Sequence, residues 1–306
     1  MLLSLSEMTG QRAPLPADPA EHPLRASLAR GDRGHARAQP ALLHLLRARE
    51  QALLSEAVIA QIAGLIADMA GQVCRVAGPG AGPPDALEER LLADDSLRNH
   101  CLALVIEWLL ALRLEEQQGL DPVLAPALQS LVTAADGAGG DLPMRALAAQ
   151  ARFAQSQRRM TLPLADLPAE LFHIALLSGR GPGQREAAPA EDQLRASYDE
   201  GETRLALFGR LASAGGDADL LSVENAGIAL WLTAVAARSG QSRQRIAFAA
   251  ADPHLGRLLL TLRAAGLAPA EAERQALLLN PDAELPRGLH DIGTREAAQW
   301  LAEAGE

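Results

Sequence analysis

One short apolar stretch constrains the fold of this chain more than any other feature. The segment CLALVIEWLLAL, from Cys101 to Leu112, is apolar at every position except Glu107. It is too short to cross a bilayer, which takes about 20 apolar residues, and too apolar to lie on a protein surface. It therefore predicts an enclosed central helix, with Trp108 as its largest core side chain.

The composition around this segment favours helices throughout. Of 306 residues, 62 are Ala and 55 are Leu, and all 28 basic residues are Arg because Lys is absent. Ala, Leu, Arg and Glu are strong helix formers, whereas the residue types that favour strands are scarce. We expect an all-α protein without a sheet, built from irregular stacked helical hairpins or a bundle. No residue signature repeats at a fixed period, so a regular solenoid is not expected.

Charge and targeting features narrow the possible partners. The formal net charge is -10, which argues against a nucleic-acid-binding protein. No uninterrupted apolar run has the length of a membrane span, and the N-terminal MLLSLSEMTG has no basic leader. The two cysteines, Cys74 and Cys101, have no metal-site spacing and are typical of buried thiols in a reducing compartment. We therefore expect a cytoplasmic location.

The chain divides into four expected regions. Residues 1–40 lack a sustained apolar period and predict a disordered arm, with at most a helical turn around Leu24–Leu28. Residues 41–178 form an expected N-terminal helical unit, 179–189 a linker, and 190–306 a C-terminal helical unit. Whether the two units share one core is left open by the sequence.

Individual helices follow from apolar spacing and from start signals. Residues 41–77 predict two helices with a break near Leu54, and the second carries an apolar stripe that includes Ile62, Ile66 and Met69. Asp121-Pro122 and Asp252-Pro253 each pair a capping residue with a residue suited to a first turn, and predict helix starts. We also expect one helix over about 191–214, another over 222–238, and four shorter helices after it. Trp300, near the end of the chain, is expected to contribute less to the core than Trp108.

A search for catalytic, cofactor or metal residues assigns none. No two of the seven histidines share a helix at metal-ligand spacing, and neither His-Glu-x-x-His nor Cys-x-x-Cys occurs. The glycine-rich pieces 78–82 and 179–183 lack the ending of a phosphate-binding loop. Adjacent helical residues point about 100° apart, so His100 and Cys101 do not form a thiol–imidazole pair. The residues weighed for chemistry are each interpreted as structural: Asp94, Asp95, His100, Cys101, His173 and His254.

Three further charged groups have structural interpretations. Arg158 and Arg159 end a helix, where cations complement the helix dipole. Arg243 and Arg245 either form a small phosphate or carboxylate patch or are solvated. Asp199, Glu200 and Glu202 are interpreted as a solvated helix face, and the neighbouring Tyr198 has either a buried partner or a surface contact.

Several segments resemble a bacterial family of helical proteins of unknown function with HEAT-like repeats. The resemblance rests on LARGD at 28–32, LLADDSLRNH at 91–100, Leu147 to Phe172, and LRAAGLAPAEAERQALLLNP from Leu262 to Pro281. It spans roughly residues 25–285. It implies a helical fold and carries no catalytic residues.

Three functions are compatible with these features. The first is a non-enzymatic scaffold or adaptor that binds a protein partner through a groove between helices. The second is a regulator that responds to a small molecule held between helices. The third is a helical enzyme whose catalytic groups are scattered along the sequence. A groove lined by exposed Leu and Arg would favour the scaffold, and a pocket with convergent titratable residues would favour the enzyme. The sequence does not set an oligomeric state.

Overall fold

The computed structural model describes residues 22–48, 56–78, 82–138, 141–180, 187–214 and 218–304. Within these ranges the chain forms fourteen α-helices and no strand, which confirms the all-α prediction. The α-helices are α1 (Pro23–Ala48), α2 (Glu56–Ala77), α3 (Pro84–Ala93), α4 (Asp95–Gln118), α5 (Pro126–Ala138), α6 (Leu142–Arg159), α7 (Ala169–Ser178), α8 (Pro189–Ser197), α9 (Arg204–Ala214), α10 (Val223–Ser239), α11 (Arg243–Ala251), α12 (Gly256–Ala264), α13 (Pro269–Leu279) and α14 (Thr294–Glu303). Short 3-10 turns are η2 (Leu164–Asp166), η3 (Glu200–Glu202), η4 (Ala218–Leu221) and η5 (Leu289–Asp291).

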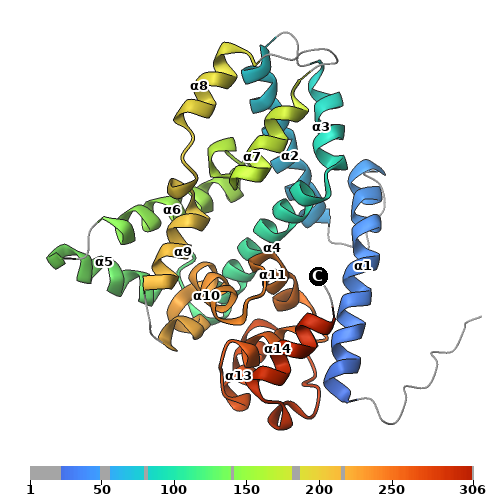
Figure 1. The fold of residues 1–306 in the computed structure, drawn as a ribbon, viewed down its shortest axis with the longest axis vertical. Coiled ribbons are helices and arrows are strands. Elements are labelled where there is room, and N and C mark those ends of the chain that lie inside the picture. Colours follow the sequence, from blue (N-terminus) through green and yellow to red (C-terminus); the bar gives the residue numbers. More distant parts are fainter. Residues whose placement is uncertain are drawn as a thin grey trace, which may run out of the picture.

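Helix α4 runs through the middle of the molecule and joins its upper and lower parts (Figure 1). At the top it packs with α2 and α3, and at the bottom it packs against α10 and α11. Helices α5, α6 and α9 lie to one side, and α12 to α14 close the lower end. Many consecutive helices contact each other, among them α2 with α3, α5 with α6, and α9 with α10.

The boundaries of α4 follow from its end residues. The side chain of Asp94 accepts a hydrogen bond from the backbone N–H of Leu97 at 2.9 Å, which caps the first turn. Gly119 ends the helix in the left-handed conformation, with φ of 68°. Both the central position of the helix and the burial of Trp108 are confirmed.

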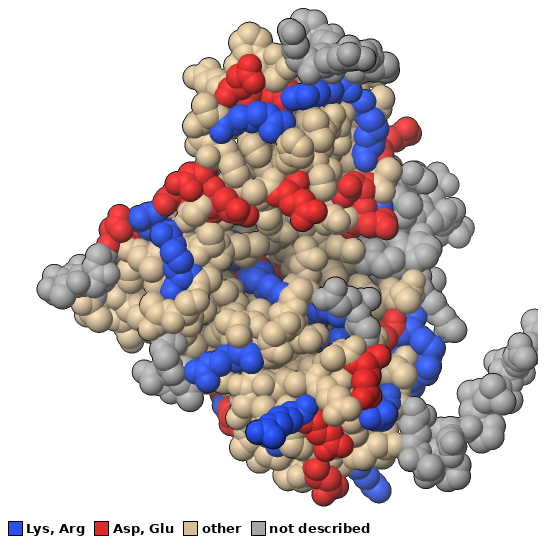
Figure 2. Space-filling view, in the orientation of Figure 1, with Lys and Arg blue, Asp and Glu red and all other residues tan. Residues whose placement is uncertain are grey.

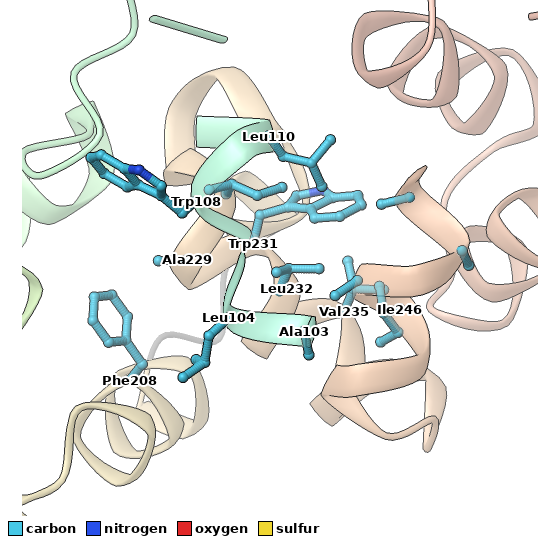
Figure 3. Close-up of a cluster of buried hydrophobic side chains, with 14 of the residues drawn as sticks. Ala103, Leu104, Trp108, Leu110, Phe208, Ala229, Trp231, Leu232, Val235 and Ile246 are labelled. Carbon is cyan, nitrogen blue, oxygen red and sulfur yellow. The ribbon is translucent and has the colours of Figure 1, made fainter. Parts of the chain in front are cut away.

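A single hydrophobic core extends across both expected helical units. Buried side chains from α2 to α14 belong to one continuous cluster. Its centre lies where α4 meets α10: Figure 3 shows Trp231 beside Leu110, with Val235 and Ile246 further along. The indole N–H of Trp231 donates to the carbonyl oxygen of Leu221 at 3.0 Å, so this large ring is buried without an unpaired donor. Among the described residues, the two expected helical units therefore share one hydrophobic core, a point that the sequence had left open.

The expected disordered arm is wrong for residues 23–40, which belong to helix α1. Leu24 and Leu28 are buried, and the Ser27 hydroxyl donates to the carbonyl oxygen of His254 at 2.5 Å. Asp32 accepts two hydrogen bonds from Arg257, at 2.7 and 2.9 Å. Because these tertiary contacts are largely polar, they leave no apolar period in the sequence. Residues 1–21 lie outside the described part of the chain, as does the predicted break near Leu54.

Other helix boundaries also differ from expectation. Asp121 and Asp252 accept backbone hydrogen bonds from residues two positions on and form turns, and the helices begin four or five residues after them. The single helix expected over 191–214 is two helices, α8 and α9, separated by η3. Trp300 is buried and packs against His22 and Arg25 of the N-terminal region, so it is not peripheral. Four helices do follow α10, as predicted.

Helix α2 has the length and mean hydropathy of a membrane span from Ala57 to Ala77. This stretch contains Asp68 and Arg75, so it does not contradict the expectation that no uninterrupted apolar run reaches the length of a membrane span. The predicted apolar stripe is confirmed, because Ile62, Ile66 and Met69 are fully buried against the rest of the protein. A core helix passes the same test of length and composition, so the test alone does not indicate a span.

Candidate functional site

A buried cluster of charged side chains lies where α4, α9 and α11 meet. Glu107 is completely buried, and both of its carboxylate oxygens accept from Arg204, at 2.6 and 2.9 Å. Oε1 of Glu107 also lies 2.8 Å from Nη2 of Arg243. Two guanidinium groups therefore share one carboxylate inside the protein.

Neighbouring groups hold the two arginines in place. Arg204 donates to the side-chain oxygen of Gln150 at 3.1 Å, and its guanidinium carbon lies 3.7 Å from the centre of the Phe153 ring. Arg243 donates to the hydroxyl of Thr233 at 3.2 Å and to the carbonyl oxygen of Ala229 at 3.3 Å. The cluster is thus fixed by planar stacking and by hydrogen bonds in addition to charge.

This environment fixes the protonation states of Glu107 and His100. Burial alone would raise the pKa of Glu107, but the charges and hydrogen bonds of Arg204 and Arg243 outweigh it and lower the pKa to about 2. Burial, reinforced by the two arginines, lowers the pKa of His100 to about 4. At neutral pH the carboxylate is charged and the imidazole is not.

A depression opens beside this cluster, and we call it the His100 pocket. Its cavity volume is about 20 Å³, and it is partly open to solvent. Its lining comes from α4, α6, η2 with the loop before it, and α9: His100, Leu104, Phe153, Ser156, Gln157, Leu162, Pro163, Asp166, Arg204 and Leu205. Figure 2 shows the molecule hollowed near its middle, with basic side chains on the floor of the hollow.

One buried polar side chain of the His100 pocket, Gln157, has a donor that lacks a hydrogen-bond partner among the described residues. Gln157 is 2% exposed, and its Nε2 donor has no hydrogen-bond acceptor. Native proteins pair nearly all buried polar groups with protein or water, so the free donor of Gln157 marks a position for a water molecule or for an acceptor atom of a ligand.

Ser156, His100 and Asp166 all line the pocket, but they do not form a catalytic triad. No hydrogen bond joins any two of them among those of the described residues, and the pKa of His100 responds to Arg204, Arg243 and Glu107 but not to Asp166. Burial raises the pKa of Asp166, against the opposing charges of Arg152 and Arg204.

A second depression, with a cavity volume of about 20 Å³, lies between α4, α5 and α10. Gln150 lines it, and the same side chain accepts the hydrogen bond from Arg204, which lines the His100 pocket. The hydrogen bond from Arg204 to Gln150 therefore links the two depressions.

The residues that the sequence analysis considered for chemistry lie in different parts of the structure. Asp94 caps α4 and Asp95 pairs with Arg98, so their structural interpretation is confirmed. Cys101 is buried, and burial raises its pKa to about 12, which makes it a poor nucleophile. Of the weighed residues, the structure places only His100 in the pocket.

The two other histidines weighed for chemistry lie elsewhere. Nδ1 of His173 lies 3.2 Å from Nη1 of Arg195 on an exposed surface. The backbone of His254 bonds to Ser27 and Asp252 beside α1. Neither residue lines the His100 pocket.

The structure confirms the predicted position of Arg158 and corrects the interpretation of Arg243. Arg158 does lie at the end of α6, where its guanidinium carbon is 5.6 Å from the centre of the Trp108 ring. Arg243 is neither solvated nor part of a surface patch, because its carboxylate partner is internal.

The acidic run at 199–202 is a capped turn rather than a helix face. Asp199 caps η3, and Glu200 accepts from the backbone N–H of Ala169 at 3.0 Å. Tyr198 has a buried partner: its ring stacks on Phe172 at 4.1 Å between centres, and its hydroxyl donates to the carbonyl oxygen of Leu167 at 2.8 Å.

Sequence reasoning missed most of the site. Glu107 carried a usable signal, because a lone charge in an apolar run needs an internal partner. Gln157 and Arg204 carried none, since polar residues at those positions are equally typical of a solvated helix.

Neither a metal site among the described residues nor a related protein was found. Within the described ranges, no group of three or more His, Cys, Asp or Glu side chains is placed to hold a metal ion. Comparison of the chain with protein-family models, with curated proteins and with solved structures found no match. The resemblance to the HEAT-like family stays a prediction.

Proposed function

We propose that this protein binds a small polar molecule in the His100 pocket and acts as a ligand-responsive helical protein. The observation that carries the proposal is the buried Nε2 donor of Gln157, which has no partner among the described residues. An unpaired buried donor costs about 1–3 kcal/mol, and an acceptor atom of a ligand would remove that cost.

Binding is better supported than catalysis. A general base works best when its pKa is near the working pH, and the pKa of His100 is lowered to about 4 by burial and the two arginines. Cys101, the nearest thiol in sequence, is held in its protonated form by burial, which raises its pKa. These groups suit recognition of a ligand more than proton or acyl transfer.

The scaffold hypothesis has less support than ligand binding. It calls for a groove lined by exposed Leu and Arg. The large apolar side chains that are exposed in the described ranges are Leu109, Met144, Met160 and Leu177, and none of them lines either depression. A protein partner and a cytoplasmic location stay predictions.

A thermal-shift screen against small polar metabolites tests the proposal. A ligand present at about 100 times its Kd stabilises the folded state by about 2.7 kcal/mol, which shifts Tm by several degrees. Ser156→Phe would fill the pocket and should abolish the shift. The matched control is Gln155→Phe, one residue away on the exposed face of the same helix, which should retain it.

Two results would count against the proposal. One is that no compound in the screen raises Tm of the unmodified protein. The other is that Ser156→Phe retains the full shift, since the ligand would then bind elsewhere.

A further inference from the structure

We infer that the first half of α1 is a strap that acid releases from the C-terminal helices before the core opens. The strap is residues 22–36, and His35 is the group whose protonation releases it. This inference is independent of the proposed function and is carried by the contacts between the strap and the surface beneath it.

The middle of the strap is fastened to α12 and to the turn before it by polar groups. Helix α1 packs mainly on α12, and less on its chain neighbours α2 and α3. Arg257 donates two hydrogen bonds to Asp32, at 2.7 and 2.9 Å. The Ser27 hydroxyl donates to the carbonyl oxygen of His254 at 2.5 Å. The strap therefore joins the start of the described chain to residues more than 200 positions further along.

The beginning of the strap is fastened to α14. Figure 1 shows α1 along one edge of the molecule, with its lower end beside α14. Arg25 pairs with Glu303 at 3.2 Å, and its guanidinium carbon lies 4.4 Å from the centre of the Trp300 ring. The ring of His22 meets the same indole edge to face, at 5.1 Å between centres. These contacts cover Trp300.

Apolar burial holds the strap less firmly than it holds the core helices. Leu24 and Leu28 are the two large apolar residues between positions 22 and 36, and both are buried. By contrast, α4 and α10 bury residues along most of their length. Segments with few buried apolar contacts open locally at a lower free energy than the core, so the strap can open in a step of its own.

The closed position of the strap depends on Gly256. A Cβ atom at this position would lie 2.5 Å from the backbone nitrogen of Leu28 and 2.7 Å from the carbonyl carbon of Ser27. Backbone atoms cannot turn aside as the end of a flexible side chain can. A larger residue at position 256 would therefore push the strap away from α12.

His35 lies between the strap and the surface that the strap covers. Its ring centre lies 4.7 Å from that of Phe248 on α11. The charged groups that face it are Asp32 on α1, Arg245 on α11, Asp252 after α11, and Arg257 on α12. These are two carboxylates and two guanidinium groups, so their charges nearly cancel at the imidazole.

Both carboxylates near His35 are already engaged. Asp32 accepts from Arg257, and Oδ1 of Asp252 accepts from the backbone N–H of His254 at 2.9 Å. A charged imidazole in the closed strap would therefore lose water without gaining a dedicated partner.

The sign of the acid response follows from this environment. Burial lowers the pKa of His35 in the closed strap, against the opposing charge of Asp32. The open strap, in which the imidazole is solvated, therefore binds the proton first. The closed strap is fully favoured above about pH 6.5, and this preference is lost as pH falls below that value.

Hydrogen exchange of the full chain at pH 7.5 and pH 5.0, corrected for the intrinsic effect of pH on exchange, tests the inference. We expect strap amides to open about a hundredfold more readily than those of α4 and α10 at both pH values. The opening constant of the strap should rise about fivefold or more at pH 5.0. Acrylamide quenching of tryptophan fluorescence should rise with it, because Trp300 loses its cover while Trp108 and Trp231 stay buried.

Two histidine variants identify the group that takes up the proton. His35→Phe keeps a ring against Phe248 and cannot be protonated, so strap opening should stay within about twofold between the two pH values. His35→Gln gives the same test if the larger ring is not accommodated. The matched control is His254→Gln, at an exposed histidine of the same surface, which should retain the acid response.

A pair of glycine variants tests the strap without any change of pH. Gly256→Ala should raise strap opening about tenfold or more at pH 7.5, because its Cβ atom meets the backbone of α1. Gly293→Ala should leave it unchanged, because a Cβ atom there meets no atom within 4 Å.

Three results would overturn the inference. If strap amides open only together with those of α4 and α10, residues 22–36 belong to the core and form no strap. If His35→Phe and His35→Gln keep the full acid response, another group takes up the proton. If Gly256→Ala leaves the protection of the strap unchanged, the strap does not close on α12.

Discussion

Glu107 is the residue on which the buried cluster depends. The isosteric substitution Glu107→Gln leaves two guanidinium groups buried without a counter-charge. Removing one partner of a buried ion pair costs about 3–5 kcal/mol. We expect a loss of this size in the free energy of unfolding, measured by urea titration.

The control for this variant is Glu115→Gln. Glu115 lies on the exposed face of the same helix, and its substitution should change the free energy of unfolding by less than about 0.5 kcal/mol. Equal losses at the two positions would show that the cluster does not stabilise the fold.

His100 gives the protein an acid sensitivity of unusual sign for a histidine. Its pKa is lowered to about 4 in the folded protein by burial and by Arg204 and Arg243, from a value of 6.5 without these effects. The unfolded chain therefore binds the proton first. The stabilisation is complete above about pH 6.5 and is lost as pH falls toward 4, on the order of 3 kcal/mol in total.

The pH dependence of urea unfolding checks this expectation. His100→Gln should flatten the profile between pH 6.5 and 4, whereas His173→Gln, at an exposed histidine, should not. Below about pH 4.5, protonation of Glu107 adds a further loss in both variants, because the pKa of Glu107 is lowered to about 2 by its arginine partners against the effect of burial. An unchanged slope in His100→Gln would contradict the assignment.

At the residue scale, the sequence indicates that Glu107 is a buried charge that needs a partner, but it does not identify that partner. Glu107 stood out because every neighbour in its run was apolar. Its partners Arg204 and Arg243 lie on helices about 100 residues or more further along the chain, and nothing local distinguishes them from solvated arginines. The three charges come together only in the fold, where α11 packs against α4 and Arg204 reaches Glu107 from the start of α9.

At the element scale, α10 contains a break that depends on one glycine. Gly227 has φ of 65° and ψ of 160°, and a Cβ atom there would lie 2.6 Å from Cβ of Ala125. Gly227→Ala therefore combines backbone strain with a steric clash, and we expect a loss of about 2–5 kcal/mol in the free energy of unfolding.

Gly209→Ala, in another helix, is expected to stabilise the protein, in contrast to Gly227→Ala. Gly209 lies in α9, and a Cβ atom there would meet no atom within 4 Å. The substitution should stabilise the protein by up to about 1 kcal/mol, through helix propensity. Thermal unfolding of both variants checks the pair, and a harmless Gly227→Ala would mean that the break in α10 relaxes readily.

Helix prediction succeeded where local signals decide and failed where tertiary contacts do. The apolar stripe of α2 is a local signal and was predicted, and Asp94, which was interpreted as structural, caps α4. Asp121 and Asp252 failed as helix starts because their carboxylates bond to the next turn instead, which the sequence alone does not distinguish from a cap. Helix α1 failed because polar contacts to α12 and the turn before it replace an apolar period.

At the scale of the whole molecule, the two expected helical units depend on each other. Glu107 belongs to the first and both of its arginine partners to the second. Helix α4 packs against α10 and α11, and α1 packs against α12. Since a domain needs its own core to fold alone, we expect that the linker predicted at 179–189 does not separate independent folding units.

Separate expression of the two halves tests this interdependence. The fragments 22–180 and 187–304 cut the chain within the range that the structure does not describe, and each loses the other's side of the core. We expect neither to show a cooperative thermal transition by circular dichroism, and both to bind a hydrophobic dye, because buried Leu side chains and one side of the charge cluster become exposed. As a control, a full chain carrying a protease site within 181–186 should, after cleavage, keep both halves associated and melt in one transition, since the contacts across the cut are retained. A cooperative transition in either isolated fragment would show instead that half of this core suffices, and that the charge cluster joins two domains that can each fold alone.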